Sequence, residues 1–473
     1  MTTGRRLIKN FLSLSGSDVI ARLLGSVLTI YIARVLGAGV FGQLSFAIAF
    51  TSYFTLFSDF GLTTLGVREI AKDKKKTSTF GTNILVLQLL LAFLLILVLS
   101  ALLIFLPLSF RTKIITFLFG LGIIPGALNM AYIFQAYEEM EYMAVGKIIA
   151  QIGYVIVGFI FIYLFKDILV LPIVSLIAGL IGAAVIFYLL KKKIKFIWSK
   201  ISWRQIKKLI ERAYPFLIAA LAVQIYYNMD SIMLQFMKGE VIVGLYNAAY
   251  KIVLLIISIG GFIAGTFFPL LSSAFKRDKK LFFKSINMWS RINGALIIPI
   301  VAGGILLARP ILNLLYGQEF VKATFAFQIL ILLPGIIFLS SVLVNPLLAI
   351  GQEKKNTIAT SIGALVNIIG NFLLIPRFSL NGAAVATLIA EVVVFSYLAF
   401  CFHKYLKINV VYKNYFSKPV LASLVMGGVL YLIRDHLPVL CSIIIGGLLY
   451  ISTMFLIKGV TKRDLKILRT VQR

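Results

Sequence analysis

Long apolar runs that contain charged residues constrain the fold of this sequence more than any other feature. Residues 18–69 hold two such runs, joined by a glycine-rich turn. Each run is long enough to cross a bilayer, which takes about 20 apolar residues. The charged residues within this stretch include Asp18, Arg22, Arg34 and Asp59. Because a charge in hydrocarbon is costly, we expect a helical membrane protein that keeps these charges inside the protein.

A weaker copy of this stretch occurs in the second half of the chain. Gly37 and Gly42 align with Gly239 and Gly244 at an offset of 202 residues. A basic cluster follows each copy, at 72–76 and at 276–280. The sequence therefore predicts a duplicated membrane protein.

The composition agrees with a membrane protein. Hydrophobic residues make up 60% of the 473 residues and charged residues only 14%. The net charge of +30 could suggest a nucleic-acid partner. However, Lys and Arg fall in short segments between apolar runs, so we expect no nucleic acid and assign the charge to topology and to anionic membrane lipids.

Fourteen spans are predicted, in an all-α membrane protein of two pseudo-symmetric six-helix lobes around a central cavity plus two extra C-terminal helices. The spans are 11–36, 40–62, 82–106, 114–135, 143–165, 169–190, 213–237, 241–268, 292–308, 325–350, 357–375, 381–402, 418–433 and 439–457. Most Lys and Arg residues lie on one side if both termini are cytoplasmic, as expected for a multi-pass protein of a prokaryotic plasma (inner) membrane.

The predicted organisation has five parts. An amphipathic cytoplasmic helix is expected between the lobes, because Ser202 can cap a helix whose apolar residues share one face. The parts are 1–190 (N-lobe), 191–212 (linker helix), 213–403 (C-lobe), 404–458 (spans thirteen and fourteen) and 459–473 (basic cytoplasmic tail).

Motifs for catalysis or cofactor binding lack the right context. Residues 37–42, GAGVFG, fit a dinucleotide-binding glycine pattern, but that pattern needs a preceding strand. The only histidines, His403 and His436, lie beside span ends, which gives a metal site or a catalytic triad almost no support. The predicted external loops are short. We therefore expect a protein that is not an enzyme and has no cofactor or metal.

Polar residues recur at helical spacing within the duplicated spans. The candidates for lining a cavity are Asp18, Ser26, Ser52, Asp59, Gln224, Asn228 and Asn247. Many such Ser, Thr and Asn side chains only bond neighbouring helices. Asp18 and Arg22 could form a local pair, and Arg34 and Asp59 could reach the interface. No acidic residue lies one turn away from Lys251 in the sequence, which favours a functional role for this lysine.

The sequence resembles the polysaccharide-unit flippases, a Wzx-like branch of the multidrug/oligosaccharidyl-lipid/polysaccharide exporter superfamily related to the lipid II flippases. The similar segments are ARVLGAGVFGQLSFAIAF (33–50), DFGL (59–62), LLAIGQEKKNTIA (347–359) and NIIGNFLLIPRFSLNGAAVATLIAE (367–391). The resemblance implies alternating access that moves a polyprenyl-diphosphate-linked glycan from the cytoplasmic to the external leaflet. It also implies that the last two helices guide the lipid tail.

The resemblance and the depth of two cations suggest a site for the substrate. Arg22 and Lys251 match cavity cations of this branch and are expected to bind the diphosphate. Asp18 would hold Arg22 when substrate is absent. Asp18, Asp59 and Glu391 are candidates for coupling to protons, sodium or the membrane potential. Machinery that polymerises or ligates the glycan is a further expected partner.

A cytoplasmic gate is predicted from a second internal match. Residues 134–148 resemble 348–362, with Glu139 aligned to Glu353. Both segments link the fourth and fifth spans of their lobe, so we expect them to face each other across the cavity mouth. The predicted gate residues are the acids Glu138, Glu139 and Glu141 and the bases Lys354 and Lys355.

Two other functions remain open on the sequence alone. A multidrug cation antiporter of the same superfamily would need an acidic cavity and usually twelve spans. A membrane polymerase or ligase of the same pathway would need a large external loop with catalytic residues. The basic residues deep in the duplicated spans and the fourteen predicted spans favour a flippase over an antiporter. The short external loops favour a flippase over a polymerase or ligase.

Overall fold

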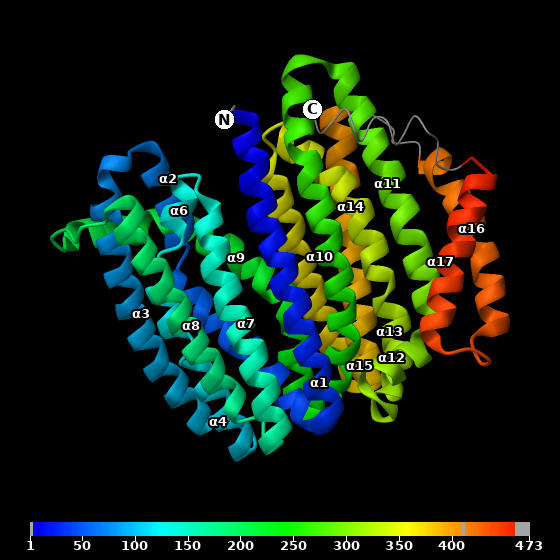
Figure 1. Cartoon of the computed structure of the whole chain (residues 1–473), viewed down its shortest axis with the longest axis horizontal. Helices are drawn as coiled ribbons and strands as arrows, with labels where there is room; N and C mark the ends of the chain where they lie inside the picture. Colours follow the sequence, from blue (N-terminus) through cyan, green and yellow to red (C-terminus); the bar gives the residue numbers. More distant parts are fainter. Residues whose placement is uncertain (1–2, 408–411, 459–473) are drawn as a thin grey trace. The chain divides into compact units, whose positions relative to one another are not determined.

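The computed structural model describes residues 3–407 and 412–458, which are almost entirely helical and contain no β-strand. Within these residues, twelve helical segments are long and apolar enough to cross a membrane. Two of them, α1 (Thr3–Asp59) and α15 (Glu353–Leu406), are each broken into two legs, at Gly37 and at Ser379. Counting both legs gives the fourteen predicted crossings, and the all-α membrane fold is confirmed (Figure 1).

The chain divides into two compact units, Met1–Gly244 and Leu245–Arg473. The first unit contains α1, α2 (Leu62–Lys72), η1 (Lys74–Lys76), α3 (Thr77–Phe105), α4 (Phe110–Gly120), α5 (Ile123–Leu128), α6 (Tyr132–Ala136), α7 (Met140–Phe165), α8 (Val170–Leu189), η2 (Leu190–Ile194), α9 (Trp203–Lys238) and the start of α10 (Glu240–Arg277). One apolar cluster of this unit joins α2, α3, α6 and α9 through residues such as Leu62, Ile84, Phe134 and Ala213.

The second unit begins within α10. It continues with α11 (Lys279–Leu306), α12 (Ala308–Tyr316), η3 (Gln318–Ala323), α13 (Thr324–Leu330), α14 (Leu332–Ala349), α15, α16 (Tyr412–Ile433) and α17 (Val439–Leu456). The last two helices pack on α11, where the Tyr450 hydroxyl donates a hydrogen bond to the Ala295 carbonyl at 2.7 Å. Gly446 lies against Leu430, so its lack of a side chain permits close packing of α16 and α17.

The segment between α8 and α9 differs in detail from the predicted linker helix. Residues 191–194 end the preceding helix, residues 195–202 are irregular, and residues 203–212 form the first turns of α9 rather than a separate helix. Ser202 does cap α9, because its hydroxyl oxygen accepts a hydrogen bond from the Gln205 backbone N–H. The linker lies inside the first compact unit. The predicted tail, 459–473, is outside the described residues.

The two aligned turn glycines have the same backbone conformation. Gly37 has φ 79° and ψ 175°, and Gly239 has φ 86° and ψ 179°. This region of φ and ψ is open essentially only to glycine. The internal match at an offset of 202 residues therefore corresponds to a repeated turn between two membrane helices.

Replacing Gly239 by alanine should destabilise the protein by about 1–3 kcal/mol, because alanine strains this backbone conformation. A Cβ at Gly239 would have no heavy atom within 4 Å, so crowding does not contribute. Gly153, inside α7, also has no atom within 4 Å of a built Cβ. Its replacement should be neutral or stabilising by about 1 kcal/mol. Thermal unfolding in detergent measures both, and equal effects would contradict the strain argument.

The segments that follow these turns cross in direct backbone contact. A Cβ on Gly42 would collide with the Glu240 carbonyl, and a Cβ on Gly244 would collide with the Ala38 carbonyl. A Cβ on either glycine would also lie only 3.0 Å from the backbone nitrogen of the other. Ala38 and Gly42 correspond to Glu240 and Gly244 at the offset of 202, so the contact is reciprocal between the two copies.

Hydrogen bonds to the Glu240 side chain hold together the helix ends next to this backbone contact. Its carboxylate accepts hydrogen bonds from Gln43 Nε2 at 2.8 Å, Ser109 Oγ at 2.8 Å and Thr112 Oγ1 at 2.5 Å. Ser109 is also the N-cap of α4. The turn between α9 and α10 is thus bonded to α1 and to the start of α4.

Candidate functional site: a polar cavity in the first unit

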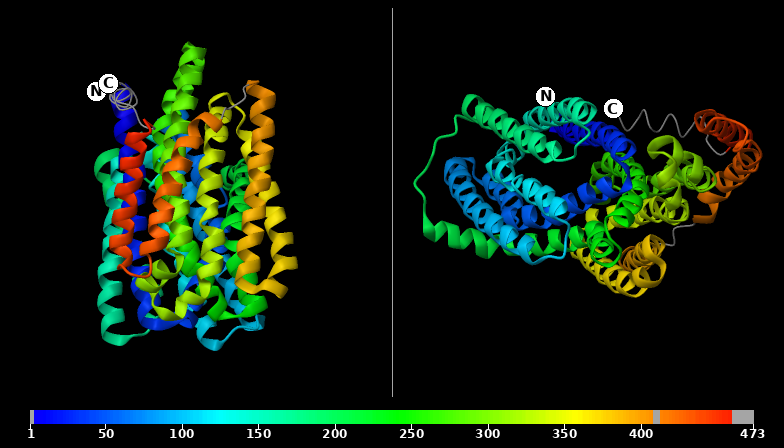
Figure 2. Two further views of the ribbon diagram at one scale, coloured as in Figure 1. Left: turned by 90° about the vertical axis from the view of Figure 1, so that its right-hand side faces the viewer. Right: turned by 90° about the horizontal axis from the view of Figure 1, so that it is seen from below.

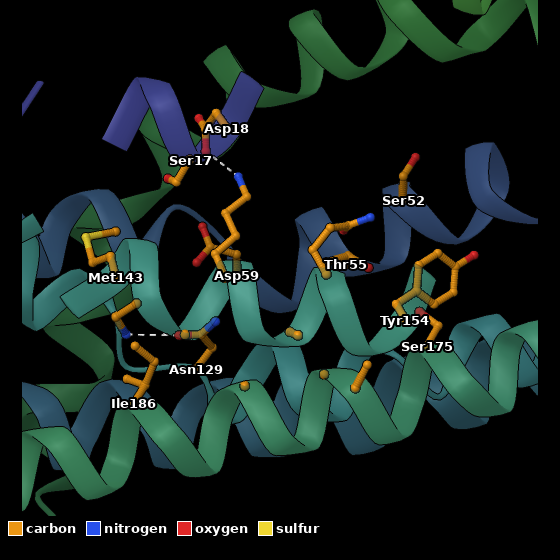
Figure 3. Close-up of a pocket in the computed structure, with 18 of the residues that line it drawn as sticks. Ser17, Asp18, Ser52, Thr55, Asp59, Asn129, Met143, Tyr154, Ser175 and Ile186 are labelled. Atoms are coloured by element: carbon orange, nitrogen blue, oxygen red, sulfur yellow. Dashed lines mark hydrogen bonds and ion pairs between the residues drawn. The ribbon is translucent and has the colours of Figure 1, made fainter. Parts of the chain in front are cut away.

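A cavity of about 1120 Å³ opens among the membrane-spanning helices of the first unit (Figure 3). Residues from α1, α7 and α8 form most of its wall, and Gln224 of α9 completes it. Asp18, Asp59 and Lys147 are its only charged lining residues among those that the structure describes. The cavity is therefore polar and close to neutral.

The lining of the cavity holds an ion pair that could not be predicted from the sequence. The Lys147 ammonium group donates a hydrogen bond to the Asp18 carboxylate, across from α7 to α1 (Figure 3). Side-chain exposures of 49% for Lys147 and 41% for Asp18 leave both groups in contact with solvent. Arg22 lies one turn further along α1, is exposed, and forms no ion pair with Asp18 among the described residues. The expected partner of Asp18 is thus replaced by Lys147.

Asp59 lines the cavity but is bonded as a helix cap. Its carboxylate accepts hydrogen bonds from the backbone N–H groups of Gly61 at 3.1 Å and Thr63 at 3.3 Å. It also accepts from the Thr63 hydroxyl and from Gln88 Nε2, the latter at 3.0 Å. These contacts satisfy the backbone at the break between α1 and α2.

Ser52 and Gln224, both predicted, meet at the wall between α1 and α9. Gln224 Nε2 donates a hydrogen bond to Ser52 Oγ, and the Tyr53 hydroxyl donates to the Gln224 carbonyl at 3.3 Å. Asn228 Nδ2 approaches the same carbonyl at 3.4 Å. Asp230, which the sequence analysis passed over, is 1% exposed and close enough to Tyr53 to interact with it electrostatically.

The rest of the polar lining consists of amide and hydroxyl groups. The members are Ser17, Thr51, Thr55, Asn129, Gln135, Gln151, Tyr154 and Ser175. Such groups donate and accept hydrogen bonds without carrying charge. Ser26 of α1 is half-buried and is not among the lining residues. The wall can therefore bind a ligand with many hydroxyl groups.

Two of the predicted site residues, Asn247 and Lys251, lie on α10 within the second unit, as do the polar residues of α15. On α10, Asn247 is buried and Lys251, one turn further, is half-buried. On α15, Asn371 Nδ2 donates to Asn367 Oδ1 at 3.0 Å, and Asn367 Nδ2 donates to Thr387 Oγ1 at 3.2 Å. These bonds join the two legs of α15, as expected for helix–helix contacts.

Glu391 lies one turn beyond Thr387 and is 4% exposed. The predicted gate residues lie at the ends of helices: Glu139 precedes α7, and Lys354 and Lys355 are in the first turn of α15. Lys355 Nζ lies 5.7 Å from the centre of the Tyr405 ring. The described residues contain no group of three or more His, Cys, Asp or Glu side chains that could hold a metal ion.

The two turns that carry the gate residues have similar backbone shapes. Glu138 has φ 59°, and Gly351 has φ 79°. The residues that follow these two also resemble each other, with φ −112° at Glu139 and φ −101° at Gln352. The structural offset is therefore 213 residues, one fewer than the alignment of Glu139 with Glu353 suggested.

Solved structures share this fold. The chain is similar to a structure described as the lipid II flippase MurJ in an inward closed conformation, with a TM-score of 0.79 and 21% identity over 96% of this chain and 99% of that chain. It is also similar to an inward-facing multidrug resistance MATE family transporter, with a TM-score of 0.61 and 17% identity over 83% of this chain and 100% of that one. The chain thus has the MurJ- and MATE-like transporter fold.

Sequence relatives include proteins of bacteria and archaea. The chain is 23% identical over 378 residues to the "Putative O-antigen transporter" of Escherichia coli strain K12, a match that covers 77% of this chain and 89% of that protein. It is 27% identical over 243 residues to a "Probable low-salt glycan biosynthesis flippase" of Haloferax volcanii, a match that covers 50% of this chain and 51% of that protein.

A family model matches the part of the chain that contains the polar cavity. Residues 7–275, which contain the whole of the polar cavity, match the family described as polysaccharide biosynthesis protein. The match includes more than half of the 473 residues. The chain is a multi-pass membrane protein that belongs to the polysaccharide biosynthesis protein family.

Proposed function

We propose that this protein is a flippase that moves a lipid-diphosphate-linked oligosaccharide across a prokaryotic plasma membrane, from the cytoplasmic to the external leaflet. The observation that supports it most is the cavity of about 1120 Å³ between membrane-spanning helices, whose polar lining consists mainly of amide and hydroxyl groups. Similarity to proteins named as O-antigen transporter and glycan flippase supports the same function. Both termini are assigned to the cytoplasm because of the distribution of Lys and Arg.

The sugar part of the substrate fits the cavity wall. Sugar hydroxyls both donate and accept hydrogen bonds, and so do the side chains of Asn129, Gln135, Gln151 and Ser175. An aromatic face, from Tyr154, is also present. Because most of these polar groups are uncharged, no single charge holds the glycan strongly, which lets it leave on the other side.

The diphosphate part requires cations. Lys147 is the basic residue of the cavity lining, and it is held by Asp18 in the absence of substrate. A diphosphate would take over the Lys147 ammonium group, in an exchange that costs little because the pair is half-exposed. Arg22 on α1 and Lys251 on α10 remain the further proposed contacts, and Arg22 offers two parallel hydrogen bonds to a phosphate.

The lipid tail fits an apolar groove in the second unit. This groove has a volume of about 530 Å³ and lies among α11, α14, α15 and α16. Its lining includes Ile298, Val301, Leu339, Val392 and Phe416. Because Phe416 belongs to α16, this helix has a place in the proposed path of the lipid.

Transport against a gradient needs a driving force. We assign it to protons, sodium or the membrane potential, with Asp18, Asp59 and Glu391 as the candidate coupling residues. Asp18 is solvent-exposed in its pair with Lys147, whereas Glu391 is buried. Machinery that polymerises or ligates the glycan would act on the flipped product, and anionic membrane lipids would contact the basic ends of the helices.

Charge reversal tests the proposed gate between Glu138, Glu139 and Glu141 on one loop and Lys354 and Lys355 on the other. Replacing both lysines by glutamate should impair export, because both proposed gate loops would then be acidic and would no longer attract each other. Replacing the three acids by lysine in the same protein should restore part of the export. Each exposed pair adds only about 0–1 kcal/mol, so the recovery requires several pairs acting together. Export no better than in the lysine variant would exclude the gate.

Deletion of the gene tests the function directly. The lipid-linked glycan should accumulate on the cytoplasmic face of the membrane, and surface polysaccharide should disappear. Both effects should be reversed by the intact protein. Unchanged lipid-linked glycan together with increased drug sensitivity would instead support a multidrug antiporter.

A further inference from the structure

A second polar cavity lies in the first unit, away from the residues of the glycan cavity. Its volume is about 490 Å³, and it lies between the end of α2, η1, the start of α3 and the start of α9. Its charged lining residues are Glu69, Lys72, Asp73, Lys76, Lys208 and Arg212. Four cations and two carboxylates give this cavity two net positive charges.

The two carboxylates are already paired. Glu69 Oε1 accepts from Lys72 Nζ at 3.1 Å and from Arg212 Nη2 at 2.8 Å. Asp73 pairs with Lys76 at 3.1 Å, and this hydrogen bond is the main cause that lowers the pKa of Asp73. Lys208 has no carboxylate within 4.0 Å among the described residues. The cavity thus has cationic hydrogen-bond donors in excess of its own anions.

Hydrogen bonds to two buried side chains of α3, Asn83 and Thr82, hold the cavity wall in place. Asn83, which is fully buried on α3, accepts from the Ser202 backbone N–H at 2.9 Å and donates to Gln205 Oε1 at 3.1 Å. The Thr82 hydroxyl accepts from the Ser199 N–H at 3.1 Å. These bonds attach the linker to α3 as it passes around the helices of this unit (Figure 2). The cationic groups are therefore preorganised on a fixed frame.

The flanks of this cavity have the composition of a membrane interface. Ile197, Trp198, Ile201 and Trp203 expose between 51% and 70% of their surface. Tryptophan is enriched where hydrocarbon meets headgroups. Exposed bases alternate with these residues at Lys200 and Arg204. A segment of this kind lies in the interface with its apolar side chains in the lipid.

We propose that this cavity binds the phosphate of an anionic phospholipid headgroup, with Lys208 and Arg212 as the principal donors. Arg212 presents a planar fork that suits phosphate oxygens, and Lys208 supplies a point charge. The bound headgroup would link the α2–η1 turn to the start of α9. This gives the expected contact with anionic lipids a defined place, independent of the glycan cavity.

The test measures lipid binding by the purified full-length protein. The probes are dioctanoyl phosphatidylglycerol, dioctanoyl phosphatidylcholine and soluble glycerol phosphate. Lys208→Glu should weaken phosphatidylglycerol binding at least about tenfold, because it removes one attraction and adds one repulsion. Lys207→Glu is the matched control, since Lys207 is adjacent, exposed and outside the cavity lining. It should change the affinity less than about threefold.

Several results would overturn the proposal. Equal losses in the two variants would mean diffuse attraction to the basic surface rather than a site. Equal affinity for phosphatidylcholine would exclude recognition of the anionic headgroup, and equal affinity for glycerol phosphate would make the ligand a soluble phosphate. If Lys208→Glu lowers the melting temperature without lipid, Lys208→Gln replaces it, with Lys207→Gln as control. The measurement reads lipid binding alone, so its outcome leaves the proposed flippase activity untouched.

Discussion

Replacing Lys147 by alanine should weaken binding of a lipid diphosphate roughly ten- to hundredfold and abolish glycan export. Lys147 is the cation of the glycan cavity, and a charge-assisted hydrogen bond to phosphate is worth about 1.5–3 kcal/mol. The protein should still fold, because a half-exposed ion pair contributes only about 0–1 kcal/mol. Farnesyl diphosphate and purified protein suffice to measure the affinity. Lys147→Arg should retain most of the binding, since the charge is kept.

Asp18→Asn separates substrate binding from a structural role of the ion pair. Both Lys147→Ala and Asp18→Asn break the same pair. If Lys147 binds phosphate, Asp18→Asn should leave the affinity unchanged or raise it by up to about fivefold, because the lysine no longer has a competing carboxylate. Equal losses of affinity in the two variants would show that the pair only holds α1 and α7 together.

Replacing either Gly42 or Gly244 by alanine should destabilise the protein by about 3 kcal/mol and lower its melting temperature by roughly 3 °C. The new methyl group would collide with a backbone carbonyl, of Glu240 in one case and of Ala38 in the other. A backbone atom cannot rotate away as a flexible side chain can, so the two crossing segments must separate. The Glu240 hydrogen bonds to Gln43 and Thr112 would then lengthen.

Gly39 provides the control for this prediction. It lies in the same segment as Gly42, and a Cβ there would be 3.7 Å from Val241 Cγ2, which is ordinary contact. Gly39→Ala should therefore be tolerated or stabilise the helix by up to about 1 kcal/mol. Thermal unfolding of the three single variants decides the matter. If Gly39→Ala is as harmful as Gly42→Ala, close backbone contact is not the reason.

Features that repeat along the chain could be predicted from the sequence. The apolar runs gave the spans, because a membrane helix needs a fixed length of apolar residues. The aligned turn glycines, Gly37 and Gly239, have matching dihedral angles. Essentially only glycine adopts this backbone conformation, so both copies of the turn contain a glycine that can be recognised in the sequence. The break in α15 falls between the predicted spans 357–375 and 381–402, but no sequence signal marks Ser379, with φ 53°, as the residue that forms it.

Contacts between distant helices could not be predicted in the same way. Lys147 and Asp18 are 129 residues apart, so no local helical spacing relates them. Asp18 was instead expected to hold Arg22, the base nearest to it on the same helix face. Asp230 is not at helical spacing from the predicted cavity residue Asn228. No expected cation lies one turn away from it on the same helix. The diphosphate roles of Arg22 and Lys251 stay predictions.

Reconstitution into vesicles tests the central claim most directly. Purified protein is placed in vesicles that hold a lipid-diphosphate-linked oligosaccharide in both leaflets, and a glycosidase added outside reports which glycans are accessible. With the intact protein, the glycosidase should in time digest nearly all of the glycan. With Lys147→Ala, as in protein-free vesicles, digestion should stop at the outer-leaflet fraction. Digestion that stops at that fraction with the intact, folded protein would contradict its assignment as a flippase.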